Sequence, residues 1–294
     1  VNEDMATNTP FGQRLGLVLE GGAMRGIYTA GVLDVFLEAG IMPDVVVGVS
    51  AGALHGCSYV AGQKGRSIRY YRKYRSDKHF MGLYSLLTTG DVVGTKFCYE
   101  DIPLRLDPFN EAAFEKAPVD FYVTVTNVRT GKPEYILCDE LKVGSKMDVI
   151  RAGASMPLCS KMVEWNGNLY LDGGVSDSIP YAKMKDFGCR KSIVVLTQPA
   201  GYLKQPAAMA PFEAMYRKYP AFVEAMRDRD QMYNTEVCAV EQAAKQGDVF
   251  LIRPSKLLHV GRMEHDIEVL NAQYELGRQD ARNQMDAMRE WIER

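Results

Sequence analysis

The sequence is poor in histidine and has no paired cysteines. Only four histidines occur among its 294 residues, and its six cysteines form no Cys-x-x-Cys pair. This arrangement is neither that of a disulfide framework nor that of a zinc site, and it favours free thiols in a reducing compartment. We therefore expect no metal site and no cofactor.

Long hydrophobic runs and an excess of one charge are also missing. No apolar stretch approaches the roughly 18 residues of a transmembrane helix, and residues 1–14 lack the apolar core of a signal peptide. The formal net charge of −2 creates no field that attracts nucleic acid. We expect a cytoplasmic protein that binds no nucleic acid and whose contact with a membrane, where it occurs, is peripheral.

The first 200 residues do contain a regular alternation of strand and helix patterns. Apolar or β-branched stretches predict strands at residues 15–19, 44–49, 120–126, 134–137, 169–171 and 192–196. Residues 27–37 have the apolar spacing of one helix face. This alternation predicts an α/β fold, with a mostly parallel sheet covered by helices on both faces.

The pattern changes from about Pro199 onward. Two long charged stretches of helical period, residues 213–246 and 265–294, flank a short strand, "DVFLIRP". We divide the chain into an α/β core, residues 13–200, and a helical C-terminal extension packed on it, residues 201–294.

The stretch "GVSAG", residues 48–52, places Ser50 between a β-branched strand and a helix of small residues. A serine in this G-x-S-x-G context makes a strained turn that exposes its Oγ at the edge of the sheet. The helix N-terminus behind it favours developing negative charge. The context predicts a nucleophile, although a buried turn serine is the alternative.

The stretch "EGGAMRG", residues 20–26, follows the first strand and precedes the first helix. Glycines there allow a tight turn that leaves backbone N–H groups uncovered. Such a turn at a helix N-terminus binds anionic groups.

A serine hydroxyl needs a base to become a good nucleophile. Two of the four histidines, His259 and His265, come late enough for the serine–acid–histidine order of an α/β-hydrolase, but they flank a charged helix start. His55 lies in the helix after the serine, and His79 lies in a basic, aromatic stretch. No histidine is therefore a strong candidate.

Asp172 is the other candidate base, because two glycines follow it in "LYLDGGVSDSIP". They let the backbone curl so that the carboxylate can approach another loop. A carboxylate within hydrogen-bond reach can accept the serine proton, and burial raises its pKa toward the useful range. Taken alone, however, the stretch is more typical of an ordinary Asp-Gly turn.

Taken together and in this order, "EGGAMRG", "GVSAG" and "DGGVSDSIP" resemble the patatin-like phospholipases, especially their bacterial branch. The resemblance covers roughly residues 13–200. It implies a patatin/FabD-like three-layer α/β/α sandwich that uses a serine–aspartate dyad without histidine. It therefore implies Ser50 as the nucleophile and Asp172 as the base.

The resemblance also gives the glycine-rich loop a role. Gly21, Gly22 and Ala23 match the family's oxyanion loop, and Arg25 completes it by adding positive potential or bracing the loop, unless it simply faces solvent at the helix start. The family usually has a third glycine where this chain has Ala23. If φ is positive there, alanine costs about 1 kcal/mol or more in strain.

The activity implied by the resemblance is serine acyl hydrolysis of a lipid ester, as in a phospholipase A. Two alternatives are a Ser-His-Asp triad carboxylesterase and a non-catalytic lipid-binding protein of the same fold. Residues 64–79, "KGRSIRYYRKYRSDKH", fit a solvated helix face, a membrane-binding surface or a nucleic-acid site. Residues 79–87, "HFMGLYSLL", fit a lid, an acyl-pocket wall or a core element.

Overall fold

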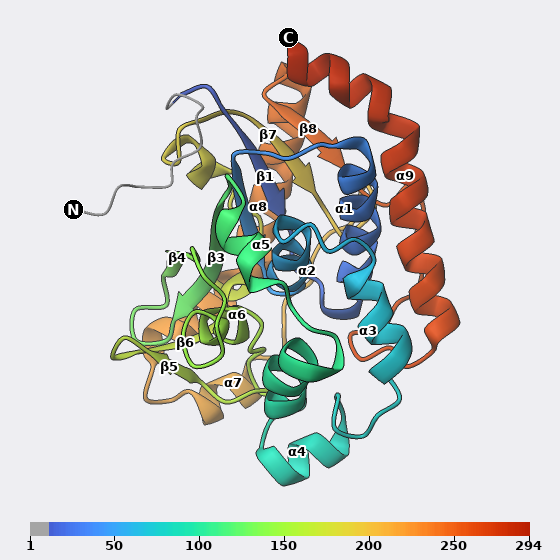
Figure 1. Ribbon diagram of the computed structural model, residues 1–294. Coiled ribbons are helices and arrows are strands. Elements are labelled where there is room, and N and C mark those ends of the chain that lie inside the picture. Colours follow the sequence, from blue (N-terminus) through green and yellow to red (C-terminus); the bar gives the residue numbers. More distant parts are fainter. Residues whose placement is uncertain (1–11) are drawn as a thin grey trace, which may run out of the picture.

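The computed structural model describes residues 12–294. The N-terminal residues, on which the signal-peptide expectation mainly rests, lie outside the described residues. An eight-stranded mixed sheet runs through the centre of the molecule, in the order β5-β6-β3-β2-β1-β7-β8, with β4 paired to β3 (Figure 1). The strands are β1 (Arg14–Leu19), β2 (Val45–Val49), β3 (Asp120–Asn127), β4 (Pro133–Leu137), β5 (Val163–Trp165), β6 (Asn168–Asp172), β7 (Cys189–Val195) and β8 (Val249–Ile252).

The sheet is mostly parallel, which confirms the prediction. Strands β1, β2, β3, β7 and β8 run in one direction. Strands β4 and β6 are antiparallel to β3, and β5 is antiparallel to β6. Every strand expected from the sequence is present, and β5 is an additional three-residue strand.

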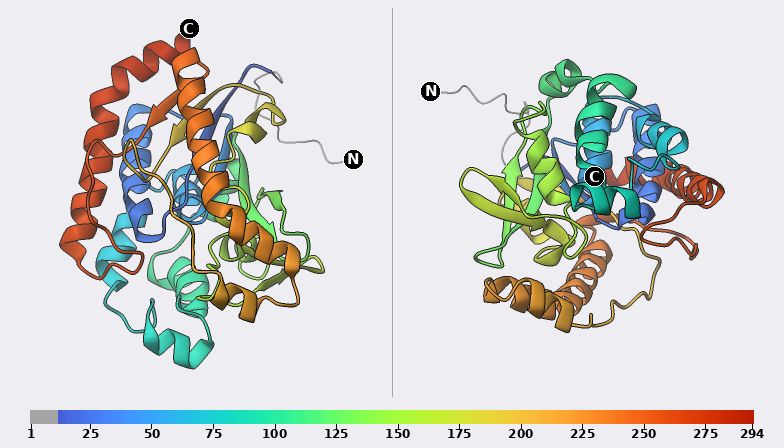
Figure 2. Two further views of the ribbon diagram at one scale, coloured as in Figure 1. Left: turned by 180° about the vertical axis from the view of Figure 1, so that it is seen from behind. Right: turned by 90° about the horizontal axis from the view of Figure 1, so that it is seen from below.

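Helices cover both faces of this sheet (Figures 1 and 2). The helices are α1 (Ile27–Ala39), α2 (Ala51–Val60), α3 (Arg66–Tyr74), α4 (Leu83–Thr89), α5 (Glu111–Lys116), α6 (Met147–Gly153), α7 (Ala210–Met215), α8 (Pro220–Gln246) and α9 (Ile267–Glu293). The shorter or irregular turns are η1 (Ala23–Gly26), η2 (Phe97–Leu106), η3 (Gly173–Val175) and η4 (Ala182–Lys185). None of the helices within residues 12–294 combines the length and the apolar character needed to cross a bilayer.

Alternate residues of the central strands supply two separate cores. Leu17 and Leu19 of β1 pack with α1, α2 and α9 on one face, whereas Val18 packs with α8 on the other. This alternation follows from the two-residue period of a strand. Since both faces are covered, the strands are apolar throughout, and the architecture is the predicted three-layer α/β/α sandwich.

The prediction of one continuous helical stretch over residues 213–246 is wrong. The chain forms the short α7 first and begins α8 only at Pro220. A residue that precedes proline is disfavoured in the helical region, and Tyr219 has φ −129° and ψ 67°. The break lets α7 lie at an angle to α8 near the end of the sheet where the candidate site lies (Figure 2).

Residues after position 200 contribute to the sheet as well as to its covering layers. Strand β8 extends the sheet by pairing in parallel with β7. Helix α8 crosses one face, and α9 packs along α1 on the other face (Figure 1). The division at residue 200 stays a prediction, because this segment and the preceding one share both cores.

Candidate active site

The register of the sheet brings two strand ends together on one edge of β3. Along that edge Thr124 pairs with Val49 of β2, and the next residue, Val125, pairs with Asp172 of β6. Strand β4 occupies the opposite edge of β3 over the same residues. The C-terminal ends of β2 and β6 therefore meet. Ser50, which follows Val49, lies beside Asp172, the last residue of β6.

Ser50 occupies a strained turn, as its sequence context predicts. Its φ of 52° and ψ of −122° are unusual for a residue with a side chain. Two glycines make room for the turn. A Cβ on Gly52 would lie 2.3 Å from the carbonyl oxygen of Leu19, and a Cβ on Gly21 would lie 2.8 Å from the Cβ of Ser50.

The side chains of Ser50 and Asp172 are joined by a hydrogen bond inside the protein. The Ser50 Oγ donates to Asp172 Oδ2 over 2.6 Å, and both residues are buried. The other carboxylate oxygen accepts a hydrogen bond from the Gly174 N–H over 2.8 Å. Burial raises the pKa of Asp172 above its ordinary value, although the Ser50 hydroxyl and the nearby Arg229 guanidinium oppose this shift.

The loop between β1 and α1 lies beside Ser50 with free backbone donors. Within residues 12–294 no carbonyl or side chain accepts a hydrogen bond from the N–H of Gly22 or Ala23. Ala23 has a positive φ of 48°, so alanine occupies the strained conformation that a glycine would tolerate.

Glu20 anchors the start of this loop. Its buried carboxylate accepts hydrogen bonds from the Thr197 N–H over 2.5 Å and from the Tyr233 hydroxyl over 2.9 Å. Both carboxylate oxygens are thus occupied by the protein. Glu20 ties the loop to the end of β7 and to α8, which is the arrangement of a structural residue.

None of the four histidines lies beside Ser50. No histidine lines either of the two cavities that meet there. His55 is buried behind the site against Tyr71, and burial lowers its pKa to about 4. The His79 ring bonds to Asp77, and His259 and His265 are exposed. The geometry gives no support to a serine–histidine triad.

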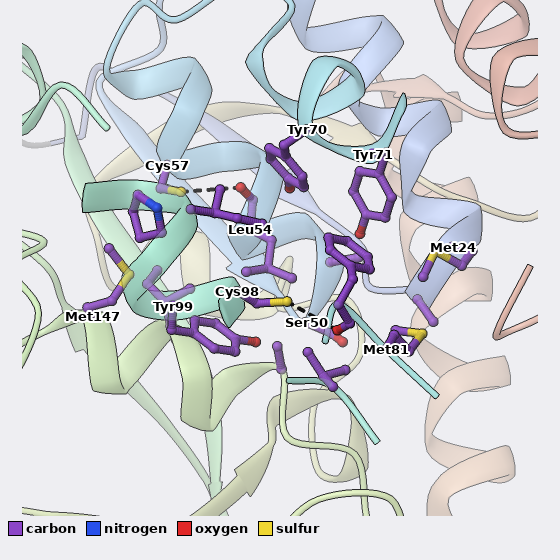
Figure 3. Close-up of a pocket in the computed structure, with 18 of the residues that line it drawn as sticks. Met24, Ser50, Leu54, Cys57, Tyr70, Tyr71, Met81, Cys98, Tyr99 and Met147 are labelled. Atoms are coloured by element: carbon purple, nitrogen blue, oxygen red, sulfur yellow. Dashed lines mark hydrogen bonds between the residues drawn. The ribbon is translucent and has the colours of Figure 1, made fainter. Parts of the chain in front are cut away.

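The first cavity at Ser50 is apolar and is formed mainly by aromatic and sulfur-containing side chains (Figure 3). Tyr70 and Tyr71 of α3 lie on one side of it, and Tyr99 of η2 lies on another. Phe80 and Met81 from the apolar segment after α3 also form part of the wall. The apolar segment at residues 79–87 therefore forms part of the pocket wall, which was one of the predicted alternatives.

The basic stretch at residues 64–79 divides into an inner and an outer face. Its three tyrosines are buried, whereas Arg72 and Lys73 are exposed. Arg66 is buried beside Asp107, which also accepts two hydrogen bonds from Arg69. Only the outer cations of α3 form a solvated face, because its aromatic side builds the apolar cavity.

The second cavity at Ser50 has both polar and apolar side chains in its lining and carries several positive charges. It extends from the glycine-rich loop and Asp172 toward α8, and it is lined by four basic residues, Arg25, Lys204, Arg229 and Arg262. The sequence analysis singled out only Arg25 among them. The helical spacing of Met226, Arg229 and Tyr233 places them on one face of α8 and was the available sequence signal for this cavity. The spacing did not indicate which element that face contacts, so the cavity was not predicted from it.

Within residues 12–294 no group of three or more histidine, cysteine, aspartate or glutamate side chains could hold a metal ion. All six cysteines are free.

Comparison with known proteins agrees with this architecture. The family model described as patatin-like phospholipase matches residues 17–184, which is more than half of the chain. The chain belongs to the patatin-like phospholipase family. It is accordingly a lipid acyl hydrolase by class. A second family model, a domain of unknown function, matches residues 219–293.

Similar proteins match this chain either over most of its length or over a shorter region. The uncharacterized protein YjjU of Escherichia coli is 29% identical over 276 residues, which are 90% of this chain and 75% of YjjU. Lysophospholipase nte1 of Aspergillus terreus is 30% identical over 182 residues, and lysophospholipase NTE1 of Saccharomyces cerevisiae is 30% identical over 190. These regions are 60% and 63% of this chain but only 11% of each lysophospholipase. Among solved structures, VipD from Legionella pneumophila aligns with a TM-score of 0.47 and 13% identity, over 95% of this chain and 67% of VipD.

Proposed function

We propose that the protein hydrolyses lipid esters as a phospholipase A-type enzyme whose catalytic groups are Ser50 and Asp172. The observation that carries this proposal is the 2.6 Å hydrogen bond from the Ser50 Oγ to Asp172 Oδ2. That distance is within the reach that general-base catalysis requires. The raised pKa of the buried Asp172 makes its carboxylate a stronger base than an exposed aspartate.

The reaction proceeds in two steps. The Ser50 Oγ attacks the ester carbonyl carbon while its proton passes to Asp172. The tetrahedral intermediate expels the alcohol, which takes that proton from Asp172, and leaves an acyl group on Ser50. Water then attacks the acyl group, Asp172 accepts the water proton, and collapse of the second intermediate returns the proton to Ser50 and releases the fatty acid.

The oxyanion of both intermediates is placed at the N–H groups of Gly22 and Ala23. Their lack of an acceptor within the described residues supports this assignment, because an unpaired donor next to a nucleophile is available to developing charge. Arg25 lines the cavity at the same loop and adds positive potential there.

The apolar cavity supplies the site for the acyl chain. It opens at Ser50 and is lined by aromatic, methionine and cysteine side chains. An acyl chain that leaves water for such a cavity gains about 0.8 kcal/mol per buried CH₂. The lysophospholipases among the similar proteins support a lipid ester as substrate over a small polar ester.

We also infer that α4 contacts the lipid surface from which substrate is drawn. Its Leu83 and Leu87 are 69% and 76% exposed. The helix lies at one end of the molecule between Met81 and Val93, which pair across a bridge and both line the apolar cavity (Figure 1). Apolar side chains beside the mouth of a lipid-binding cavity suit an interface between water and membrane.

Cations flank α4, and their charge supports the inference that the lipid surface it contacts is anionic. The ammonium group of Lys78 lies 4.6 Å from the centre of the Tyr84 ring, and Lys161 donates to the Thr89 carbonyl at the other end of the helix. Basic residues beside exposed apolar ones add electrostatic attraction to anionic head groups.

The test is hydrolysis of a p-nitrophenyl ester and of a lysophospholipid by the whole chain. Wild type should hydrolyse both and react at Ser50 with a fluorophosphonate, whereas Ser50→Ala should do neither. Ser160→Ala is the matched control serine and should behave as wild type. The proposal is contradicted if Ser50→Ala keeps both hydrolytic activities. It is also contradicted if the wild-type protein binds vesicles but is not labelled by a fluorophosphonate.

A further inference from the structure

The second cavity beside Ser50 gathers positive charge from four parts of the chain. Arg25 comes from the glycine-rich loop, Lys204 from the segment before α7, Arg229 from α8 and Arg262 from the loop before α9. Within residues 12–294 none of the four is in a close salt bridge, but Arg25 and Lys204 act electrostatically on Glu20, and Arg229 acts on Asp172. Positive charges repel one another, and these four cations outnumber the two carboxylates of the same lining, Glu20 and Asp172, by two.

Two of the four cations, Lys204 and Arg229, are held in place by contacts with the surrounding protein. Lys204 is fixed by Asn234, whose side chain accepts from the Lys204 N–H over 2.9 Å and donates to its carbonyl over 3.1 Å. Its ammonium lies 4.1 Å from the centre of the Tyr233 ring. Arg229 donates from its Nε to the Gly174 carbonyl over 2.6 Å, which leaves both terminal nitrogens of its guanidinium without a partner in the described residues.

A buried donor of Arg25 also lacks a partner. Its Nε has no hydrogen-bond acceptor within residues 12–294 and is shielded from solvent. Burial and the neighbouring arginines lower the pKa of Lys204 to about 8. A bound anion would satisfy the first group and stabilise the charge of the second.

The cavity holds two carboxylates, and both already accept hydrogen bonds from the protein. Its acidic lining residues are Glu20 and Asp172. The oxygens of Glu20 are taken by Thr197 and Tyr233, and those of Asp172 by Ser50 and Gly174. With four cations against two carboxylates, the cavity favours an anion over an ammonium group such as that of choline or ethanolamine.

We propose that the cavity lined by Arg25, Lys204, Arg229 and Arg262 binds the phosphate of an anionic lipid head group that carries no ammonium. This inference rests on the proposed function, because Ser50 belongs to the linings of both cavities. A lipid with its acyl chain in the apolar cavity and its phosphate among the four cations places its ester at Ser50. Arg229 and Arg262 also fall within the matched domain of unknown function, which thereby completes the substrate site.

The test compares three substrates that share one acyl chain: lysophosphatidic acid, lysophosphatidylcholine and the uncharged monoacylglycerol. The substitutions are Lys204→Met and Arg262→Gln, since neither residue bonds to Ser50 or Asp172. Lys245→Met, an exposed charge loss on α8 about 24 Å along the helix from Arg229, is the matched control.

Wild type should have a kcat/KM for lysophosphatidic acid about tenfold or more above that for lysophosphatidylcholine. Each substitution should lower kcat/KM for lysophosphatidic acid about fivefold to tenfold, mainly through KM, with less than about a twofold change for monoacylglycerol. Equal losses on all three substrates, or an unchanged preference between the two phospholipids, overturn the proposal.

Binding to the Ser50→Ala variant separates this proposal from the proposed function. Calorimetry with a non-hydrolysable ether analogue of lysophosphatidic acid should detect binding that Lys204→Met weakens, even if no ester is cleaved by the wild type. Inorganic phosphate should bind far more weakly than the ether lipid. Equal affinity for the two would mean that the cavity holds a free anion and would overturn the head-group assignment.

Discussion

Ser50 and Asp172 are 122 residues apart in the chain, yet they share a hydrogen bond because β2 and β6 end against the same edge of β3. The antiparallel direction of β6 is essential to this meeting, because a parallel strand would place its C-terminal residue at a distance from Val49. Strand direction and register thus position the two side chains before any loop does. The account predicts that groups acting on Asp172 alter the chemistry of Ser50.

The first prediction concerns the pH dependence of kcat/KM. Because burial raises the pKa of Asp172 and the base must be ionised, activity should fall on the acid side at a pH above the ordinary aspartate range. The positive charge of Arg229 opposes the shift, so Arg229→Met should move this acid limb to higher pH. Arg229→Lys keeps the charge and is the control; a limb at the same pH in both variants contradicts the assignment.

The second prediction concerns Ala23. Its positive φ predicts that Ala23→Gly relieves backbone strain and raises the free energy of unfolding by about 1 kcal/mol. Chemical denaturation measures the change, and ester hydrolysis should be retained because glycine keeps the N–H. Ala23→Val, with a β-branched side chain, should be less stable than wild type. A destabilised glycine variant would show that the conformation is not strained.

A third prediction concerns two half-buried carboxyl groups close to the site, Asp177 and Glu236. Glu236 accepts hydrogen bonds from the Ser178 and Ile179 N–H groups, and burial together with the neighbouring Asp177 raises its pKa. An acid with a raised folded-state pKa stabilises the fold fully below its unfolded pKa of about 4.3 and loses that contribution as pH rises toward the folded value.

Replacement of Glu236 should therefore flatten the pH profile of stability. In urea unfolding from about pH 4.3 upward, the stability of Glu236→Gln should increase relative to that of wild type, because the variant lacks the destabilising titration of Glu236. Glu241→Gln, on the same helix and paired with Arg253, is the control and should keep the wild-type slope. Parallel profiles for Glu236→Gln and wild type would show that this group does not titrate across that range.

The fourth prediction concerns the exposed leucines of α4. The double substitution Leu83→Ser and Leu87→Ser removes apolar surface and should weaken binding to anionic vesicles about tenfold. Cosedimentation with phosphatidylglycerol-containing vesicles measures the change, while hydrolysis of a soluble p-nitrophenyl ester should persist. Leu257→Ser, at a leucine that is 55% exposed in the segment between β8 and α9, is the control. Equal vesicle binding by wild type, the double variant and Leu257→Ser would show that α4 does not contact the lipid surface.

Much of the fold was predictable because its signals are local. The β-branched strand before Ser50 and the small residues after it predicted β2 and α2, and the glycine-rich loop predicted the entry to α1. Strand β5 was not predicted, because it is only three residues long. The turn that follows it, Asn166-Gly167, was a hairpin signal between that strand and β6.

The site was less predictable, because its parts depend on long-range packing. The residues around Asp172 alone favoured an ordinary turn, and only the resemblance indicated a base. Lys204, Arg229 and Arg262 carry no motif, and their convergence follows from how α8 and the loop before α9 fold back over the sheet. Tyr70 and Tyr71 looked like part of a basic surface, whereas amphipathic helix packing turns them into a cavity wall.

The central claim is that Asp172 takes the Ser50 proton without an imidazole, and the most direct measurement is the single-turnover rate of Ser50 acylation by a p-nitrophenyl ester. In Asp172→Asn this rate should fall by about 10² to 10⁴ at neutral pH, while the combined variant His79→Ala, His259→Ala and His265→Ala should stay within about threefold of wild type. The account would be contradicted by near-normal acylation in Asp172→Asn together with a collapse in the histidine variant.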